Sequence, residues 1–225
     1  MKGFTGLSLF VFLLLLALLP LLFGQLMAAS LVKLHLSPGT ALLLTIGIIL
    51  GGLINIPVKR IAQDRDVAVH PLAVFGFSDA WPGLRRVRRQ TVIAVNVGGC
   101  LIPTGLAVYE LAHLAARDPQ LLLAAAVASV VNIVVCYLLA RPVPGVGILM
   151  PGLIPPIVAA LLALILAPEQ AAPIAFVAGV TGPLVGADLL HLKDIQKSAV
   201  GIASIGGAGT FDGIILSGII AAYLA

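Results

Sequence analysis

The chain has 225 residues, of which 60% are hydrophobic and 10% are charged, and its mean hydropathy is +1.17. A soluble domain of this composition would be coated in apolar surface, so we expect lipid to be part of its solvent. The formal charge of +4 does not indicate a nucleic-acid partner, because the basic residues flank apolar stretches.

Seven apolar stretches approach the roughly 20 residues that a helix needs to cross the hydrocarbon of a bilayer. In chain order they cover residues 7–27, 38–58, 91–114, 120–140, 147–167, 171–187 and 198–224, and a loop at 59–90 separates the second from the third. The last stretch contains a glycine run, so we expect a broken helix or a re-entrant turn there. The sequence therefore predicts an all-α membrane helix bundle, a single domain with about seven transmembrane segments.

Lysine and arginine are divided unevenly between the loops of this arrangement. Eleven lie on the side of the amino terminus and loop 59–90, and two, Lys33 and Arg117, lie on the other side. The positive-inside rule then predicts a protein of the inner (plasma) membrane with its amino terminus in the cytoplasm and its carboxyl terminus outside. We interpret the basic run 85–89 as a topology anchor at anionic lipid head groups, and the segment around Arg65 as a short hairpin or interfacial element.

Polar side chains inside the hydrocarbon are costly and mark candidate functional sites. Most of them fall in the cytoplasmic half of the predicted spans: Asn55, Asn96, Asn132, Asp188, His191 and Asp212. Glu110 and His113 lie toward the outside. Each asparagine alone is explained by an amide that bridges two helices, whereas their shared depth favours a functional site.

Asp188 and Asp212 stand at the facing ends of the last two stretches, and each has a structural interpretation. Asp212 is a candidate N-cap of the last half-helix, and Asp188 is a candidate partner of Lys193 or Lys197. A hairpin would instead bring the two acids together, and two such carboxyls share one proton. One then acts as a base toward water while the other protonates a carbonyl oxygen, which is the chemistry of aspartic proteases.

Further residues would assist such a pair. His191 is a neighbour that would tune the acids, and glycines let backbone or substrate approach closely; those around the second acid are Gly207, Gly209 and Gly213. Cys100 and Cys136 lie in apolar runs and are interpreted as packing residues. Nucleotide-binding, haem and clustered metal-ligand motifs are absent from the sequence, so we expect no cofactor and no metal.

The motifs Gly186-Ala187-Asp188-Leu189-Leu190-His191 and Gly206-Gly207-Ala208-Gly209-Thr210-Phe211-Asp212-Gly213 resemble the hallmark of a family of prokaryotic multi-pass membrane proteins, a domain of unknown function. The layout is also similar to intramembrane aspartyl proteases of the presenilin and signal-peptide-peptidase type, which carry one catalytic Asp on each of two consecutive helices. Asp188 and Asp212 match those positions. The motifs differ, because Gly209-Thr210-Phe211 replaces Gly-x-Gly, no Tyr precedes Asp188, and the Pro-Ala-Leu motif is missing.

Three functions follow as hypotheses. The first is an aspartyl-protease-like hydrolase that cleaves transmembrane peptides with the two acids. The second is a cation- or proton-coupled transporter or channel, in which the same acids and the three asparagines bind the cation. The third is a non-catalytic membrane scaffold that presents the basic loop to a partner.

Overall fold

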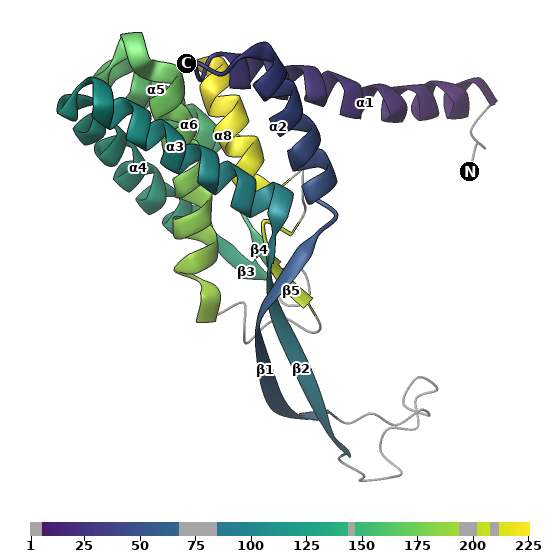
Figure 1. Ribbon diagram of the computed structural model, residues 1–225. Coiled ribbons are helices and arrows are strands. Elements are labelled where there is room, and N and C mark those ends of the chain that lie inside the picture. The colour runs from purple at the N-terminus through teal and green to yellow at the C-terminus, as the bar shows by residue number, and fades with distance from the viewer. Residues whose placement is uncertain (1–5, 68–84, 144–146, 194–201, 208–211) are drawn as a thin grey trace.

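The computed structural model describes residues 6–67, 85–143, 147–193, 202–207 and 212–225. These residues form a bundle of helices, and a small β-sheet projects from one end of it (Figure 1). We call this end the sheet end. The far end carries the loop after the first helix and the carboxyl terminus, which meet where Lys33 Nζ donates a hydrogen bond of 2.7 Å to the carbonyl oxygen of Tyr223.

Most of the described residues are helical. The α-helices are α1 (Gly6–Val32), α2 (Pro38–Gly51), α3 (Ile102–Arg117), α4 (Pro119–Leu139), α5 (Ile154–Leu166), α6 (Ala171–Thr181) and α8 (Gly213–Leu224). The π-helical turns η3 (Val97–Leu101) and η5 (Gly182–Leu189) extend α3 and α6 at the sheet end, and the short 3-10 turn η4 (Pro168–Gln170) precedes α6.

Three helical segments in the described part of the chain are long and apolar enough to cross a membrane: Val97–Arg117, Pro119–Leu139 and Pro168–Leu189. The helices α2, α5 and α8 are also apolar but shorter, between 10 and 17 residues. The structure thus supports a membrane protein with three such helices, and the count of seven crossings stays a prediction.

The predicted helical fold is confirmed for most of the described residues, but strands form at both ends of the segment 59–90 and extend beyond it. β1 (Asn55–Val67) and β2 (Arg85–Asn96) pair antiparallel, from Asn55 opposite Asn96 to Val67 opposite Arg85. The sequence predicted that residues 55–58 and 91–96 belong to the second and third membrane spans, but they form strands instead. These short runs are rich in Val, Ile and Thr, which favour strands, and hydropathy alone does not separate an apolar strand from a helix.

Strands also shorten the expected fifth and seventh spans. β3 (Arg141–Val143) pairs antiparallel with β4 (Gly147–Leu149), so α5 begins only at Ile154. β5 (Ile202–Ile205) pairs parallel with β2, which gives a sheet with the order β1-β2-β5. Pro151 and Gly152, which are poor helix formers, precede α5, and Pro155 and Pro156 lie in its first turn, where proline is tolerated. α8 begins at Gly213.

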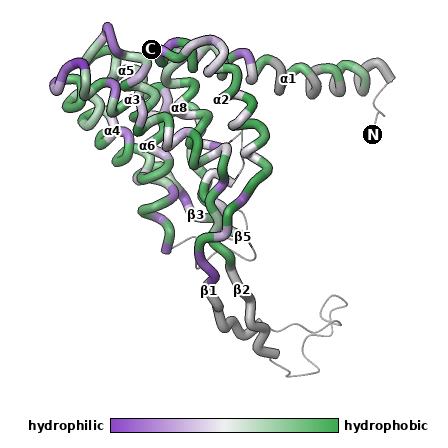
Figure 2. Tube along the Cα trace, viewed as in Figure 1, coloured by the Kyte–Doolittle hydropathy of each residue, from purple (hydrophilic) through white to green (hydrophobic). Residues whose placement is uncertain are grey.

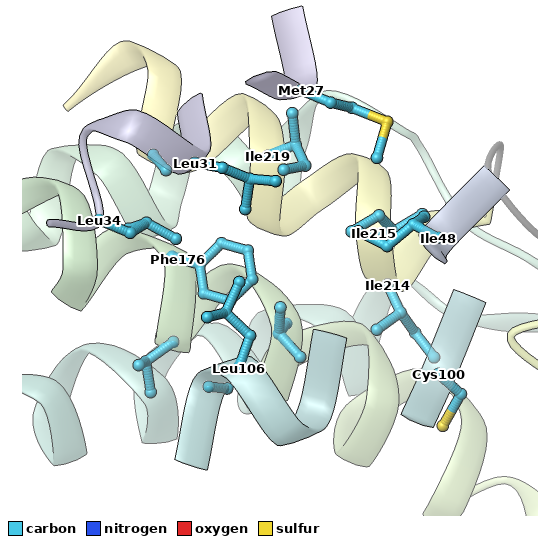
Figure 3. Close-up of a cluster of buried hydrophobic side chains, with 14 of the residues drawn as sticks. Met27, Leu31, Leu34, Ile48, Cys100, Leu106, Phe176, Ile214, Ile215 and Ile219 are labelled. Carbon is cyan, nitrogen blue, oxygen red and sulfur yellow. The ribbon is translucent and has the colours of Figure 1, made fainter. Parts of the chain in front are cut away.

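The core is built around α6, whose residues from Ile174 to Val180 are all buried. Phe176 belongs to a cluster of buried apolar side chains from α1 and the turn after it, α2, α3, η3, α6 and α8. Figure 3 labels the other members as Met27, Leu31, Leu34, Ile48, Cys100, Leu106, Ile214, Ile215 and Ile219. A second cluster joins α4, α5 and α6 largely through alanines, among them Ala125, Ala159 and Ala175. Such small residues let helices approach closely within a membrane.

The outer surface of the bundle is apolar as well. Figure 2 shows hydrophobic residues along the helices, with hydrophilic ones gathered at helix ends and in the strands. Leu43, Leu138 and Ile165 have exposed fractions of 71%, 72% and 76%. The first part of α1, which extends sideways from the bundle in Figure 1, exposes Phe10 and Leu14. A surface of this kind suits lipid rather than water.

Candidate functional site

The two predicted acids both lie at the sheet end, one near the end of η5 and the other at the start of α8. Asp188 lies in η5, and its carboxyl interacts electrostatically with that of Asp212. Both acids also act electrostatically on the thiol of Cys100 in η3. The packing of α6 and η5 against α8 brings these residues together. Both acids are half-buried, so neither side chain is completely enclosed by the fold.

Asp212 also has the structural role that the sequence allowed for it. Its Oδ1 accepts a hydrogen bond of 3.0 Å from the backbone N–H of Ile214, which makes it the N-cap of α8. An N-cap uses one carboxylate oxygen to bind an N–H that the helix leaves without a partner. The cap therefore fixes the carboxyl at the helix start, and the position of α8 determines where it points.

A glycine turn connects the sheet to this acid pair. Gly206 follows β5 with φ of +70°, a conformation that glycine adopts without steric cost, and its backbone N–H donates a hydrogen bond to Asp188. A Cβ on Gly206 would lie 2.7 Å from the carbonyl carbon of Gly99. Position 206 therefore requires glycine both for its φ and for the close approach to η3.

The other predicted glycines have weaker roles. The Gly207 N–H donates to the Ser204 carbonyl oxygen at 3.1 Å and closes the turn after β5. Gly213 is exposed at the start of α8, where a Cβ would be 3.9 Å from Met150 Cε. Gly209 lies outside the described residues.

Two of the three predicted asparagines form one network beside the acids. Asn96 is fully buried, and its Nδ2 donates to the carbonyl oxygen of Gly52 at 2.8 Å and to Asn55 Oδ1 at 3.1 Å. Its Oδ1 accepts from the N–H of Gly99 at 2.7 Å and caps η3. Ser204 Oγ donates to Asn55 Oδ1 at 2.6 Å. The network ties α2, β1, β2, η3 and β5 together, so it positions the glycine turn.

Asn132 and His191 have partners other than the acids. Asn132 Nδ2 donates to the carbonyl oxygen of Ala178 at 2.8 Å, so it joins α4 to α6. His191 Nδ1 lies 3.1 Å from the carbonyl oxygens of both Gly186 and Ala187, and its ring centroid is 4.8 Å from that of Tyr137. A protonated Nδ1 would donate to these carbonyls, so His191 binds the end of η5.

Strand β5 is an edge strand of the three-stranded sheet, because the order β1-β2-β5 leaves one side of it without a strand among the described residues. Its carboxyl end leads through the glycine turn to Asp188. A free strand edge presents N–H and C=O groups that bind another extended chain. The site therefore combines two carboxyls with a neighbouring edge that suits an extended peptide.

Cys100 and Ser204 were missed as site residues by the sequence analysis. Cys100 was interpreted as a packing residue, and it is indeed buried. Nothing in the local sequence marks either residue, because the fold alone brings η3 and β5 to the acids. In the part of the chain that the structure describes, no group of three or more His, Cys, Asp or Glu side chains is arranged to hold a metal ion.

One comparison with known proteins gives a match. Residues 49–224 match the family model described as a protein of unknown function (DUF1614). No curated protein and no solved structure matches the chain. The match covers most of the chain, including both acids and the whole sheet, but its description assigns no activity.

Proposed function

We propose that this chain, which belongs to the DUF1614 family, is an intramembrane hydrolase that cleaves peptide bonds with Asp188 and Asp212. The proposal rests on the packing of η5 against α8, which brings the two carboxyls within electrostatic range of each other. They lie near an edge of β5 that has no neighbouring strand among the described residues. The two carboxyls are the reason for proposing hydrolysis, and the edge of β5 is the reason for proposing a peptide as the substrate.

The pair supplies both proton transfers that hydrolysis needs. Two neighbouring carboxyls hold one proton between them. The ionised one takes a proton from a water molecule, and the water oxygen attacks the carbonyl carbon of the scissile bond. The protonated one gives its proton to the carbonyl oxygen. When the resulting gem-diol collapses, the C–N bond breaks and the first carboxyl gives the proton that it took from water to the amine nitrogen. A hydroxyl of the gem-diol gives its proton to the second carboxyl, so the pair returns to its starting state.

The edge of β5 would hold the substrate. An extended peptide that adds to a free strand edge is bound by main-chain hydrogen bonds, which do not depend on its side chains. Beyond the strand, the turn at Gly206 and Gly207 leads the chain to Asp188, so a peptide bound along β5 would be directed toward the acid pair. This arrangement favours a peptide over a small ion as the ligand of the site.

The location in the cell is part of the same proposal. The sheet end carries Lys59, Arg60, Arg141 and Lys193, whereas the far end carries Lys33 and Arg117. By the positive-inside rule the sheet end faces the cytoplasm. We propose a multi-pass protein of a prokaryotic inner membrane, with its amino terminus in the cytoplasm and its carboxyl terminus outside, that cleaves transmembrane peptides at the cytoplasmic face.

The test uses the full chain in lipid vesicles with a library of synthetic transmembrane peptides, and mass spectrometry detects the products. We expect Asp188→Asn and Asp212→Asn each to lower the cleavage rate by about 100-fold or more, the usual range for loss of a general acid or base. Asn is also a good N-cap, so the second variant keeps the start of α8.

The matched control is Asp118→Asn, because Asp118 is exposed and caps α4 through a hydrogen bond of 2.8 Å to the N–H of Gln120. This variant has the same chemical change at another helix start and should cleave normally. Cleavage that survives both changes in the acid pair refutes the proposal, and so does a folded wild type that cleaves no peptide of the library.

Transport of a cation or proton by the same acids is the second candidate function. It is favoured by the interrupted helices at the site, since α6 becomes π-helical at Gly182 and α8 begins at Gly213, and transporters use such breaks to bind ions. Flux of protons or sodium ions into vesicles that is lost in Asp212→Asn, without peptide cleavage in the wild type, would establish transport instead.

A further inference from the structure

Glu110 is an acid that is fully buried, and it lies on a different helix from the acid pair at the sheet end. It lies in α3, its side chain is 0% exposed, and both carboxyl oxygens lack a hydrogen-bond partner among the described residues. Leu106, one turn before it, belongs to the first apolar cluster, and Leu114, one turn after it, belongs to the second. The carboxyl therefore lies between the two apolar cores of the bundle.

The helices around Glu110 offer no charge that would pair with an ionised carboxylate. α3 packs against α2, α4, α6 and α8. α2 and α6 contain no ionisable residue, α4 contains only Cys136 and Tyr137, and α8 contains only Tyr223. Arg117 acts on Glu110 electrostatically, but it is exposed and lies two turns along the same helix. An unpaired charge in such surroundings costs several kcal/mol or more, and the group instead takes up a proton.

Two histidines lead from this acid to the far end. His113 follows Glu110 by three residues, a spacing that places side chains next to each other on a helix. Its Nε2 is buried, and no described residue forms a hydrogen bond with it. The ring centroids of His113 and His35 are 5.8 Å apart. His35 is exposed in the loop between α1 and α2, so the row of three residues ends at the surface.

A cavity opens the same region to solvent. It has a volume of about 470 Å³ and lies between α2 and α3, lined by residues that include His35, Ser37, Thr40, Leu106 and Tyr109. It extends from the histidine loop to the turn of α3 that precedes Glu110. Partial desolvation of the His35 ring, together with its electrostatic interactions with Arg117 and His113, lowers the pKa of His35 from its ordinary value of 6.5. His35 is therefore largely neutral at pH 7 and able to accept a proton.

We propose that Glu110 is a proton-binding site, separate from the acid pair, which exchanges its proton with the far side of the membrane through His113 and His35. In the outward direction a side-chain rotation brings Glu110 and His113 within hydrogen-bond reach. The carboxylic acid O–H then gives its proton to the imidazole nitrogen of His113, which becomes an imidazolium. His113 passes a proton to His35, and His35 releases it to water. The carboxylate that remains takes up the next proton by the reverse path.

The first test is chemical modification by a hydrophobic carbodiimide of the full chain in lipid vesicles, mapped by mass spectrometry. The O–H of a protonated carboxyl adds across a C=N bond of the reagent, and the product rearranges to a stable N-acylurea. We expect an adduct on the peptide that contains Glu110 at neutral pH and its loss in Glu110→Gln. The matched control, Glu169→Gln, changes an exposed acid in η4 and should leave the adduct unchanged.

Failure to modify Glu110 in the folded wild type at neutral pH would overturn the proposal, as would equal modification by a water-soluble carbodiimide. A stability measurement gives an independent check, because Gln imitates a neutral carboxyl. Glu110→Gln should have a melting temperature at least as high as the wild type, and a clearly lower one would mean that an ionised Glu110 is required.

The route through the histidines is tested by infrared spectroscopy. The carbonyl stretch of the Glu110 carboxylic acid, identified by its absence in Glu110→Gln, shifts when its proton exchanges for deuterium in D₂O. We expect His113→Gln to slow this exchange. An exchange rate equal to that of the wild type would rule out the route. Neither result depends on whether the chain cleaves peptides.

Discussion

Asn96 is the buried polar residue with the most hydrogen bonds at the sheet end. Its amide donates to Gly52 and Asn55 and accepts from Gly99, and the side chain is 0% exposed. A buried donor or acceptor that loses its partner costs about 1–3 kcal/mol. Because the three partners lie directly after α2, in β1 and in η3, this one residue helps to determine how the sheet joins the bundle.

We expect Asn96→Ala to lower the free energy of unfolding by about 2–4 kcal/mol, since it leaves the carbonyl of Gly52 and the N–H of Gly99 without partners and removes a helix cap. Denaturation of the protein in mixed micelles measures the effect. Gln120→Ala, at an exposed position, serves as the control and should change stability by less than about 0.5 kcal/mol. A similar small change in both variants would show that the network does not stabilise the fold.

At the scale of elements, glycines set the distance between η5 and α4. A Cβ built on Gly186 would contact the carbonyl oxygen of Ile133 and lie 2.9 Å from Cys136 Cβ, and one on Gly182 would contact Asn132 Nδ2. Backbones this close are typical of membrane helices packed through small residues. Since Asp188 lies on the same turns as these glycines, their packing against α4 also holds the acid in place.

We expect Gly186→Ala to destabilise the protein by about 1–3 kcal/mol, because the added methyl group has no space between η5 and α4. Gly105→Ala is the matched control: Gly105 lies in α3, and nothing lies within 4 Å of a Cβ there. This variant should be neutral, or more stable by up to about 1 kcal/mol from helix propensity. Unfolding in mixed micelles compares the two, and equal stability of both variants would contradict the close packing.

On the scale of the whole molecule, the two ends of the bundle differ in chemistry. The sheet end carries most of the basic residues together with the acid pair and the asparagine network. The far end carries Lys33, His35, Arg117 and the carboxyl terminus, and a cavity between α2 and α3 is lined by His35 there. The two acidic sites therefore lie toward opposite ends of one bundle, and each would exchange protons with a different side of the membrane.

Single cysteines test this orientation in cells, in a background with Cys100→Ala and Cys136→Ala. We expect Glu169→Cys, exposed at the far end, to react with a membrane-impermeant maleimide in intact cells. Lys193→Cys, exposed at the sheet end, should react only after the membrane is opened, because the positive-inside rule puts it in the cytoplasm. The reverse pattern would invert the proposed topology, and reaction of both in intact cells would exclude it.

Composition was sufficient to assign the chain to a membrane, because the free energy of transfer into lipid depends on which residues a stretch contains and little on what they contact. The stretches 120–140 and 171–187 coincide closely with helical segments for this reason. The spacing of Asp188 and Asp212 also indicated where to look for a site. The sequence did not predict the strands at residues 55–58, 91–96 and 202–205. These strands form only by pairing between segments that are distant in the chain, and a local hydropathy pattern does not indicate such pairing.

The composition of the site depended on that same pairing. β5 lies beside β2, and the turn that follows it brings the N–H of Gly206 to Asp188. Ser204 and Cys100 belong to the site because of these contacts, although neither stands out in the chain. The sequence also did not show that Glu110 lacks a charged partner on the neighbouring helices. The environment of a buried acid is formed by residues that are distant in the chain, so only the packing of the helices reveals it.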